Sequence, residues 1–241
     1  MNRVALVTGA AGGIGSATVT RLVEQGYAVV GVDLEPAEES ETVAHVVGDV
    51  RDRAVLQQAA DLAIERWGRL DAAVAAAAVI RGGQPLWQTP PADLDELWQS
   101  DVIGVWNTAA VVVPHLLAQP DPSGCRFVAV ASAAGSHGLF HLAAYNTVKH
   151  AVVGLVKGLA ADLVGTGVTA VAVSPGSTRT PMLDATARLY GLDDADELAS
   201  HQLLRRVLEP AEVAATIAFC CSVEGAALNG GVVQADGGFT G

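Results

Sequence analysis

The sequence is poor in charged and aromatic side chains, and its charges are mostly of one sign. Of its 241 residues, 17% are charged and 5% are aromatic, and the formal net charge is −12. An excess of negative charge repels phosphate groups, both on a nucleic acid and on an anionic lipid surface. We therefore expect neither nucleic acid nor a membrane among the partners of this protein.

Cysteine is scarce, and no stretch has the composition of a targeting or membrane-spanning segment. The three cysteines, Cys125, Cys220 and Cys221, lack the spacing of a metal site, and adjacent cysteines seldom pair with each other. No apolar run reaches the ~18 residues of a spanning helix, and no basic segment with a cleavage site follows Met1. These features predict reduced thiols, a cytoplasmic location and no metal.

The chain is rich in short apolar runs that alternate with helical segments. Its hydrophobic fraction of 51% and its length suit one large domain with a buried core. Seven β-branched runs alternate with helix-like stretches, a pattern typical of a parallel sheet covered by helices on both faces. We therefore predict an α/β fold, a single domain over residues 1–241 with a doubly wound parallel sheet of about seven strands.

Residues 177–206 break this alternation. They are polar, contain the acidic run LDDADE and lie between the sixth apolar run and the last helical segment. We predict that they form an excursion over the mouth of the sheet and act as a substrate lid.

The first apolar run leads into a glycine-rich turn that precedes a helical segment. Glycines permit a tight turn and a close approach of the backbone, and the free amides of a helix N-terminus bind a pyrophosphate. The residues of this turn that we assign to dinucleotide binding are Gly9, Gly12, Gly13, Ile14 and Gly15.

Two acidic positions extend the predicted nucleotide site. Asp33 closes the second strand, 18 residues beyond Gly15, where a carboxylate accepts hydrogen bonds from the ribose hydroxyls and repels a 2′-phosphate. No Arg or Lys lies in the glycine turn or just after Asp33, so the sequence favours NAD over NADP. Asp49 and Val50, after the third strand, are candidates for contact with the adenine, although Asp49 is also a candidate helix N-cap.

A second group of polar side chains lies in the second half of the chain. Tyr145 and Lys149 are four residues apart, so on a helix they share one face. A neighbouring ammonium favours the phenolate and lowers the pKa of a tyrosine towards the range of a general base. Ser132 follows an apolar run that ends as a strand would, and its hydroxyl is placed to hold the same substrate oxygen. This trio suits chemistry on a carbinol or a carbonyl.

Together these residues resemble the short-chain dehydrogenase/reductase family, in its single-domain form, over essentially the whole chain. Ser132 precedes Tyr145 by thirteen residues, the spacing usual in that family. The other matching features are the turn TGAAGGIG, Asp33, Asp49-Val50, Pro175-Gly176 with Thr178 and Thr180, and the DGG at 236–238.

The resemblance implies a Rossmann fold, NAD as cofactor, a small-molecule alcohol or carbonyl substrate, and a homotetramer or homodimer. In this family Tyr145 is the acid/base, Lys149 lowers the pKa of Tyr145 and holds the nicotinamide ribose, and Ser132 orients the substrate oxygen. Pro175, Gly176, Thr178 and Thr180 correspond to the segment that holds the nicotinamide carboxamide.

The sequence departs from the family pattern at two places. Alanines occupy 75–78, where the family has N-N-A-G, so the backbone of Ala76 and Ala77 still lines the ribose but the bracing asparagine side chains are absent. Asp101 stands where the family has the catalytic asparagine that holds a water in the proton relay. A carboxylate there either raises the pKa of Lys149 and weakens its help to Tyr145, or is held neutral by burial.

Several stretches are more narrowly similar to the mycofactocin-associated branch of the family in actinobacteria. They are residues 65–80, 82–87, 163–183, 186–192 and 234–241. This resemblance implies an alcohol dehydrogenase whose NAD is held tightly and is reoxidised by a mycofactocin-type redox carrier, a peptide-derived molecule, without exchange with the free pool.

Four further side chains are candidates for contact with the substrate. His137 and His141 lie between Ser132 and Tyr145, while Met182 and Tyr190 belong to the excursion and suggest an apolar alcohol. The alternative is that the excursion residues pack the lid onto the body. At the level of function, two other hypotheses stay open: a non-catalytic NAD-binding sensor or partner, and an epimerase or dehydratase that uses NAD without net redox change.

Overall fold

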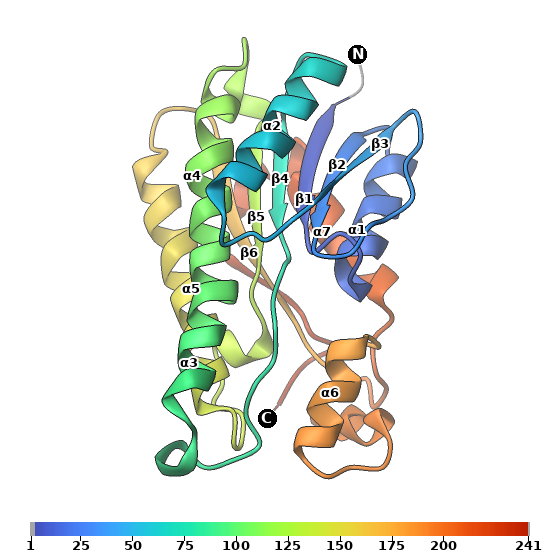
Figure 1. The fold of residues 1–241 in the computed structure, drawn as a ribbon, viewed down its shortest axis with the longest axis vertical. Coiled ribbons are helices and arrows are strands. Elements are labelled where there is room, and N and C mark those ends of the chain that lie inside the picture. The colour runs from blue at the N-terminus through green and yellow to red at the C-terminus, as the bar shows by residue number, and fades with distance from the viewer. Residues whose placement is uncertain (1–2, 241) are drawn as a thin grey trace.

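The apolar runs of the sequence form a sheet of seven parallel strands in the computed structural model, which describes residues 3–240 (Figure 1). The strand order is β3-β2-β1-β4-β5-β6-β7, and every pairing is parallel. The strands are β1 Val4–Thr8, β2 Ala28–Asp33, β3 Val43–Val47, β4 Ala72–Ala75, β5 Arg126–Val130, β6 Thr169–Pro175 and β7 Val232–Ala235. The predicted α/β fold with a seven-stranded parallel sheet is confirmed.

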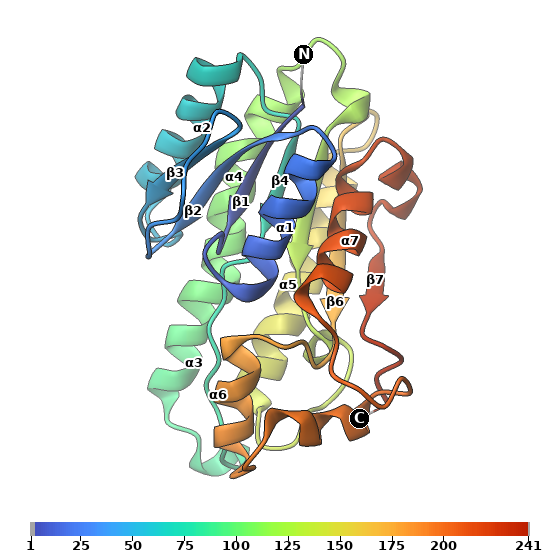
Figure 2. The ribbon, with the colours of Figure 1, turned by 90° about the vertical axis from the view of Figure 1, so that its right-hand side faces the viewer.

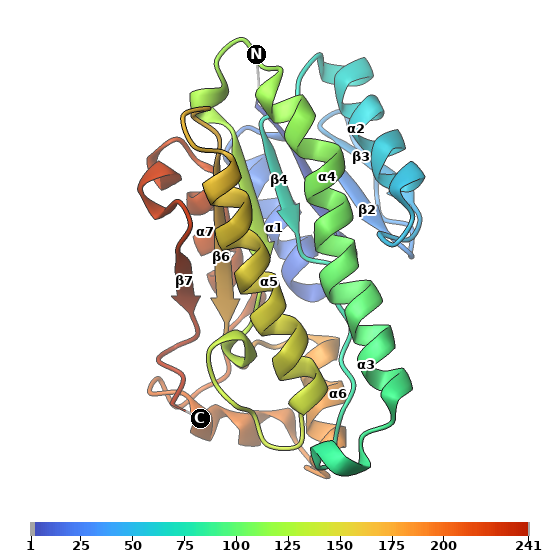
Figure 3. The same ribbon diagram turned by 90° about the vertical axis from the view of Figure 1, so that its left-hand side faces the viewer.

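Helices connect the strands and cover both faces of the sheet. The α-helices are α1 Gly13–Glu24, α2 Arg53–Trp67, α3 Pro91–Leu97, α4 Gly104–Leu117, α5 Ala143–Asp162, α6 Pro181–Leu189 and α7 Pro210–Cys221. Short 3-10 segments occupy Leu86–Gln88, Pro122–Gly124, Ala133–Gly135, Ala195–His201 and Glu224–Leu228. Figure 2 shows α1 and α7 in front of one face, and Figure 3 shows α2, α4 and α5 in front of the other.

The core consists of two apolar layers, one on each side of the sheet. Because successive strand residues point to opposite faces, Val4 and Leu6 pack in one layer while Ala5 and Val7 pack in the other. Side chains of α2, α4 and α5 complete the first layer, and side chains of α1 and α7 complete the second. Both faces are buried, which explains why the strand sequences are continuously apolar.

One long helical segment runs from α3 through a π-helical turn, η2 (Trp98–Ile103), into α4. By length and composition, Pro91–Leu117 meets the requirements of a membrane span, but 56% of its apolar window is buried in the protein, as in a core helix. The π-helical turn places Asp101 on the buried side of this segment, where its exposed fraction is 0%. Widened turns of this kind occur often at functional sites.

The strand order reverses between β1 and β4, and the excursion 177–206 lies beyond the carboxyl ends of the strands (Figure 1). Helix α6 begins at Pro181, and the Thr180 hydroxyl caps it by accepting a hydrogen bond from the Leu183 amide at 3.3 Å. Leu183 and Leu198 belong to a small apolar cluster that is separate from the two core layers. The excursion therefore has a small apolar cluster of its own, also packs through Met182 and Tyr190 against a cluster of the body that contains Tyr145, and extends over the carboxyl edge of the sheet.

Candidate active site

A cavity of about 1120 Å³ opens at the carboxyl edge of the sheet. Its wall combines the β1–α1 turn, residues at or just after the ends of β2 to β6, one end of α5 and the excursion 177–206. In doubly wound sheets, ligands bind at this edge and at the point where the strand order reverses. The wall includes every residue that the sequence assigned to the cofactor: Gly9, Gly12, Gly13, Ile14, Gly15, Asp33, Asp49, Val50, Ala76, Ala77, Tyr145, Lys149, Pro175, Gly176, Thr178 and Thr180.

The glycine turn is packed so closely that side chains do not fit at three of its positions. Gly9 has a positive φ of 68°, and a Cβ on it would lie 2.8 Å from the Ala77 backbone nitrogen. A Cβ on Gly15 would lie 1.9 Å from the Gly9 carbonyl oxygen, and one on Gly13 would lie 2.5 Å from Cγ2 of Thr180. No side chain caps the N-terminus of α1, so its amides are free to bind a phosphate at the cavity wall.

Carboxylates line the far end of the cavity, near the ends of β2 and β3. Asp33 accepts a hydrogen bond from the Ala11 amide at 2.9 Å, which ties the end of β2 to the glycine turn. Glu35 also lines the wall. Arg51, which sequence reasoning missed, lies beside them, and its Nε donates to Oδ2 of Asp49 at 2.8 Å. Hydrogen bonds from Arg51 hold the pKa of Asp49 below its ordinary value.

The pairing with Arg51 bears on the two roles proposed for Asp49. The helix cap is not Asp49, because the side chain of Asp52 caps α2 by accepting from the Ala54 amide. Contact of Asp49 with adenine has to compete with Arg51, since both carboxylate oxygens of Asp49 already accept hydrogen bonds from that residue.

The alanines at the end of β4 are braced from the neighbouring strand. The buried Thr8 hydroxyl accepts hydrogen bonds from the amides of Ala76 at 3.1 Å and Ala77 at 3.3 Å. This hydroxyl braces β4 where the family pattern has asparagine side chains. In the sequence, the only feature that hinted at this contact was the threonine at the last position of β1.

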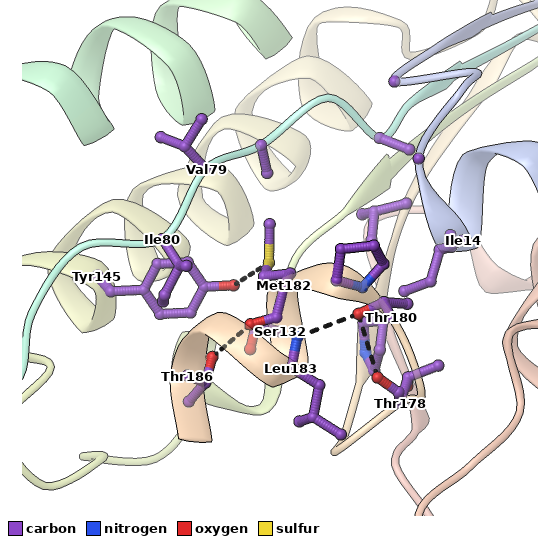
Figure 4. A pocket seen from close by; sticks show the side chains of 18 of the residues that line it. Ile14, Val79, Ile80, Ser132, Tyr145, Thr178, Thr180, Met182, Leu183 and Thr186 are labelled. Atoms are coloured by element: carbon purple, nitrogen blue, oxygen red, sulfur yellow. Dashed lines mark hydrogen bonds between the residues drawn. The ribbon is translucent and has the colours of Figure 1, made fainter. Parts of the chain in front are cut away.

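Ser132, Tyr145 and Lys149 all line the cavity. Ser132 follows β5, and its hydroxyl accepts from the Ala134 amide at 3.1 Å. The Tyr145 hydroxyl points towards the Met182 sulfur, 4.0 Å away (Figure 4). Lys149 Nζ lies 5.5 Å from the centre of the Tyr145 ring. The three side chains, from two different elements, form a connected group that faces a common space in the cavity.

Asp101 approaches this group from behind the cavity wall. Its Oδ2 lies 3.1 Å from Lys149 Nζ, and its Oδ1 accepts a hydrogen bond from the Val79 amide at 2.9 Å. Both members of the ion pair are buried, with exposed side-chain fractions of 0% for Asp101 and 3% for Lys149. Asp101 does not line the cavity itself, but it contacts two residues that do, Lys149 and Val79.

The electrostatics of this buried group differ from the simple pairing of a tyrosine and an ammonium. Burial raises the pKa of the Tyr145 phenol; the Lys149 charge opposes this rise, and the Asp101 charge adds to it. Burial lowers the pKa of Lys149, but Asp101 and Tyr145 outweigh it, so the net shift is upward and Lys149 keeps its proton. Burial raises the pKa of Asp101 against the opposing effect of Lys149. The pKa of Tyr145 is therefore raised, where the sequence predicted a lowered one.

The structure brings two of the four candidate substrate residues to the cavity. Met182 and Tyr190 line it, and the Tyr190 hydroxyl donates to the Phe140 carbonyl at 2.8 Å. His137 and His141 do not line it. The His137 ring packs on Phe239, with 5.5 Å between ring centroids, and the His141 ring stacks on Phe140 at 3.6 Å.

The histidine that lines the cavity is His201, from the excursion. No spacing or motif in the sequence singled it out. Aliphatic and aromatic side chains dominate this part of the wall: Val79, Ile80, Leu139, Phe140, Leu142, Leu183, Leu192, Leu198 and Phe239.

The residues of the cavity fit a nicotinamide dinucleotide. Free amides at the start of α1 suit the pyrophosphate, the carboxylates at the end of β2 suit ribose hydroxyls, and the wall continues from there to Tyr145 and Lys149. Within residues 3–240, no cluster of three or more His, Cys, Asp or Glu side chains is arranged to hold a metal ion.

Comparisons with known proteins agree with this arrangement. A family model described as enoyl-(acyl carrier protein) reductase matches residues 9–240. The oxidoreductase UcpA of Escherichia coli O157:H7 is 34% identical, covering 99% of this chain and 94% of UcpA. An A-factor type gamma-butyrolactone 1′-reductase of Streptomyces virginiae is 33% identical, with 99% and 96% covered. The 3-ketoacyl-(acyl-carrier-protein) reductase of Brucella melitensis, solved in complex with NADH, superposes with a TM-score of 0.86 at 27% identity, over 98% and 97% of the two chains.

The tight packing of the glycine turn predicts that Gly15→Ala abolishes binding of a nicotinamide dinucleotide at concentrations that saturate the parent protein. The added Cβ collides with the Gly9 carbonyl and forces the turn to move. Titration calorimetry measures the effect. Gly124→Ala is the matched control, because a Cβ there meets no atom within 4 Å. Unchanged binding by Gly15→Ala would contradict the assignment of this turn.

Proposed function

The chain belongs to the short-chain dehydrogenase/reductase family, and we propose that it is an NAD-dependent oxidoreductase that interconverts a secondary alcohol and a ketone. The observation that carries this proposal is the meeting of Ser132, Tyr145 and Lys149 in the wall of the cavity that also contains the glycine turn.

The proposed chemistry divides between the cofactor and the side chains. A nicotinamide cofactor accepts or donates the hydride at the carbinol carbon. Tyr145 moves the proton of the substrate oxygen, Ser132 orients this oxygen and stabilises its developing charge, and Lys149 holds the nicotinamide ribose. The apolar wall around Met182 excludes water and favours a substrate with a hydrophobic body.

Replacing Tyr145 by Phe removes the proton donor and acceptor but keeps the ring that packs in the buried cluster. We expect turnover to fall by roughly 10²–10⁴-fold, the usual contribution of general acid–base catalysis. Steady-state kinetics with a panel of hydrophobic ketones and alcohols measures it. Tyr27→Phe is the control, because that hydroxyl bonds to the Cys221 carbonyl at 2.9 Å, far from the cavity. Near-normal turnover by Tyr145→Phe would refute the assignment.

The choice of NAD over NADP rests on charge at the end of β2. The carboxylates of Asp33 and Glu35 repel a 2′-phosphate, and the nearby cation Arg51 is already paired with Asp49. A dinucleotide whose adenosine lies against these two carboxylates therefore binds better when its adenosine ribose has both hydroxyls free, as in NAD.

We expect Asp33→Ser to raise the Kd for NAD by roughly 10- to 100-fold, the range for loss of a hydrogen bond to a charged group. The same change reduces the preference for NAD over NADP, because it removes one repelling charge. Fluorescence titrations of both nucleotides with the parent and the variant test this, with Glu24→Ser on the surface of α1 as control. A parent protein that binds NADP more tightly than NAD would overturn the proposal.

The proposal extends to reoxidation of the bound cofactor by a mycofactocin-type carrier. Four of the five stretches that resemble that branch contribute to the cavity wall, through residues that include Ile80, Met182, Tyr190 and Phe239. Protein purified without added nucleotide is expected to contain NAD, to reduce it once with an alcohol, and to turn over only with an electron-accepting dye. Steady turnover with free NAD and no dye would exclude this extension.

We also propose that the protein is cytoplasmic and assembles as a homotetramer or homodimer through α4 and α5. Trp106 on α4 is 56% exposed, and Gly154 and Gly158 on α5 face open space, so the side of the molecule seen in Figure 3 offers an apolar and close-packing surface. Light scattering that gives the mass of a single 24.6 kDa chain would contradict the assembly.

A further inference from the structure

Asp101 is the one carboxylate that the described structure places against the catalytic side chains. It lies in the π-helical turn η2, fully buried, and contacts Lys149 Nζ at 3.1 Å and the Val79 amide at 2.9 Å. An asparagine of the same shape would keep the hydrogen bond from Val79 but would carry no charge. Burial raises the pKa of this carboxyl, but the Lys149 ammonium in contact with it and the Val79 amide both favour its ionised form. The ion pair therefore holds a negative charge that an asparagine would not supply.

The groups around the Tyr145 phenol come from five parts of the chain. Its own helix α5 contributes Lys149, η2 contributes Asp101, and the loop after β5 contributes the neutral Ser132. Helix α6 contributes the Met182 sulfur, Tyr190 just after α6 packs against the same apolar cluster, and the segment after β4 contributes apolar Ile80. Among residues 3–240, the charges that act on this phenol are those of Lys149 and Asp101.

The pairing of these two charges changes what Lys149 does. In a buried site a lone ammonium stabilises a nearby phenolate strongly, because little water screens it. A carboxylate in contact with the ammonium cancels most of that field, so burial of the phenol becomes the dominant influence. A buried phenol with no net positive neighbour keeps its proton.

We propose that Asp101 is a positioning residue that neutralises Lys149 and keeps Tyr145 protonated at neutral pH, so that Tyr145 is ready to donate a proton to a ketone and has to ionise before it can accept one from an alcohol. This inference rests on the proposed function. In the reduction, the carbonyl carbon takes a hydride from the reduced nicotinamide cofactor, the carbonyl π bond breaks, and the oxygen takes the Tyr145 proton. Water then returns a proton to Tyr145. Alcohol oxidation needs the phenolate, so its rate rises with pH.

The first test needs neither cofactor nor turnover. The ultraviolet absorbance of tyrosinate is followed against pH for the parent and for Tyr145→Phe, and the difference isolates Tyr145 from Tyr27 and Tyr190, whose pKa values burial raises to about 12. The same pair is measured in an Asp101→Asn background. We expect the ionisation midpoint of Tyr145 to fall by about one pH unit or more when the carboxylate is removed.

The second test is the pH profile of alcohol oxidation. Because oxidation requires the phenolate, its rate rises with pH through the ionisation of the coupled Tyr145–Lys149 pair. Asp101→Asn is expected to move this rising limb to lower pH by the same amount. Asp71→Asn is the control: its carboxylate is also buried and paired with an arginine, but it lies outside the cavity and leaves the position of the limb unchanged.

An identical midpoint in the parent and in Asp101→Asn, or a midpoint that moves to higher pH, would overturn the inference. If Asp101→Asn does not fold, the absorbance titration of the parent and of Tyr145→Phe still tests the inference. Ionisation of Tyr145 near neutral pH in the parent would contradict it. A protein that turns over no alcohol or ketone defeats the proposed function, while the absorbance titration continues to test the inference on its own.

Discussion

The parallel direction of all seven strands is the constraint on which the site depends. Because every strand runs the same way, their carboxyl ends meet at one edge, and the segments that follow them must face one another there. The reversal of strand order between β1 and β4 keeps the connecting helices on opposite faces and leaves that edge open. The glycine turn, Asp33, Ser132 and the excursion 177–206 are far apart in the sequence and line one cavity for this reason.

Beside that cavity, the buried Asp101–Lys149 ion pair supplies the two charges that act on the Tyr145 phenol, the proposed acid/base. Buried ion pairs contribute little net stability, since the cost of removing both charges from water offsets their attraction. The pair is held nonetheless by a π-helical turn and by the Val79 amide, in direct contact with the catalytic helix. In the proposed mechanism the consequence of the pair is chemical, because Asp101 reduces the effect of the Lys149 charge on the Tyr145 phenol.

The sequence predicted those parts of the structure whose physical signals are local. The apolar runs predicted the seven strands, and the cluster of glycines predicted the close-packed turn after β1. Helical spacing and the end of a strand predicted that Ser132, Tyr145 and Lys149 lie together. Contacts between distant segments had no such signal. Arg51 binds Asp49, Thr8 braces β4, and His201 enters from a loop whose path cannot be read from composition. His137 and His141 were expected at the cavity because of their position in the chain, but His141 adopts a positive φ of 54° and both rings pack on phenylalanines. The charge of Asp101 was visible in the sequence, while its contact with Lys149 required the fold.

The central claim is that this chain transfers a hydride directly between a nicotinamide and a substrate carbon. The most direct measurement is mass spectrometry of the products after protein freed of bound nucleotide is loaded with NADH deuterated at C4, in separate samples labelled on each face of the ring, and incubated with hydrophobic ketones. The account predicts an alcohol that carries one deuterium on its carbinol carbon with one of the two labelled samples. No alcohol from any ketone, or alcohol without deuterium from both samples, would contradict it and would favour a sensor or a cofactor use without net redox change.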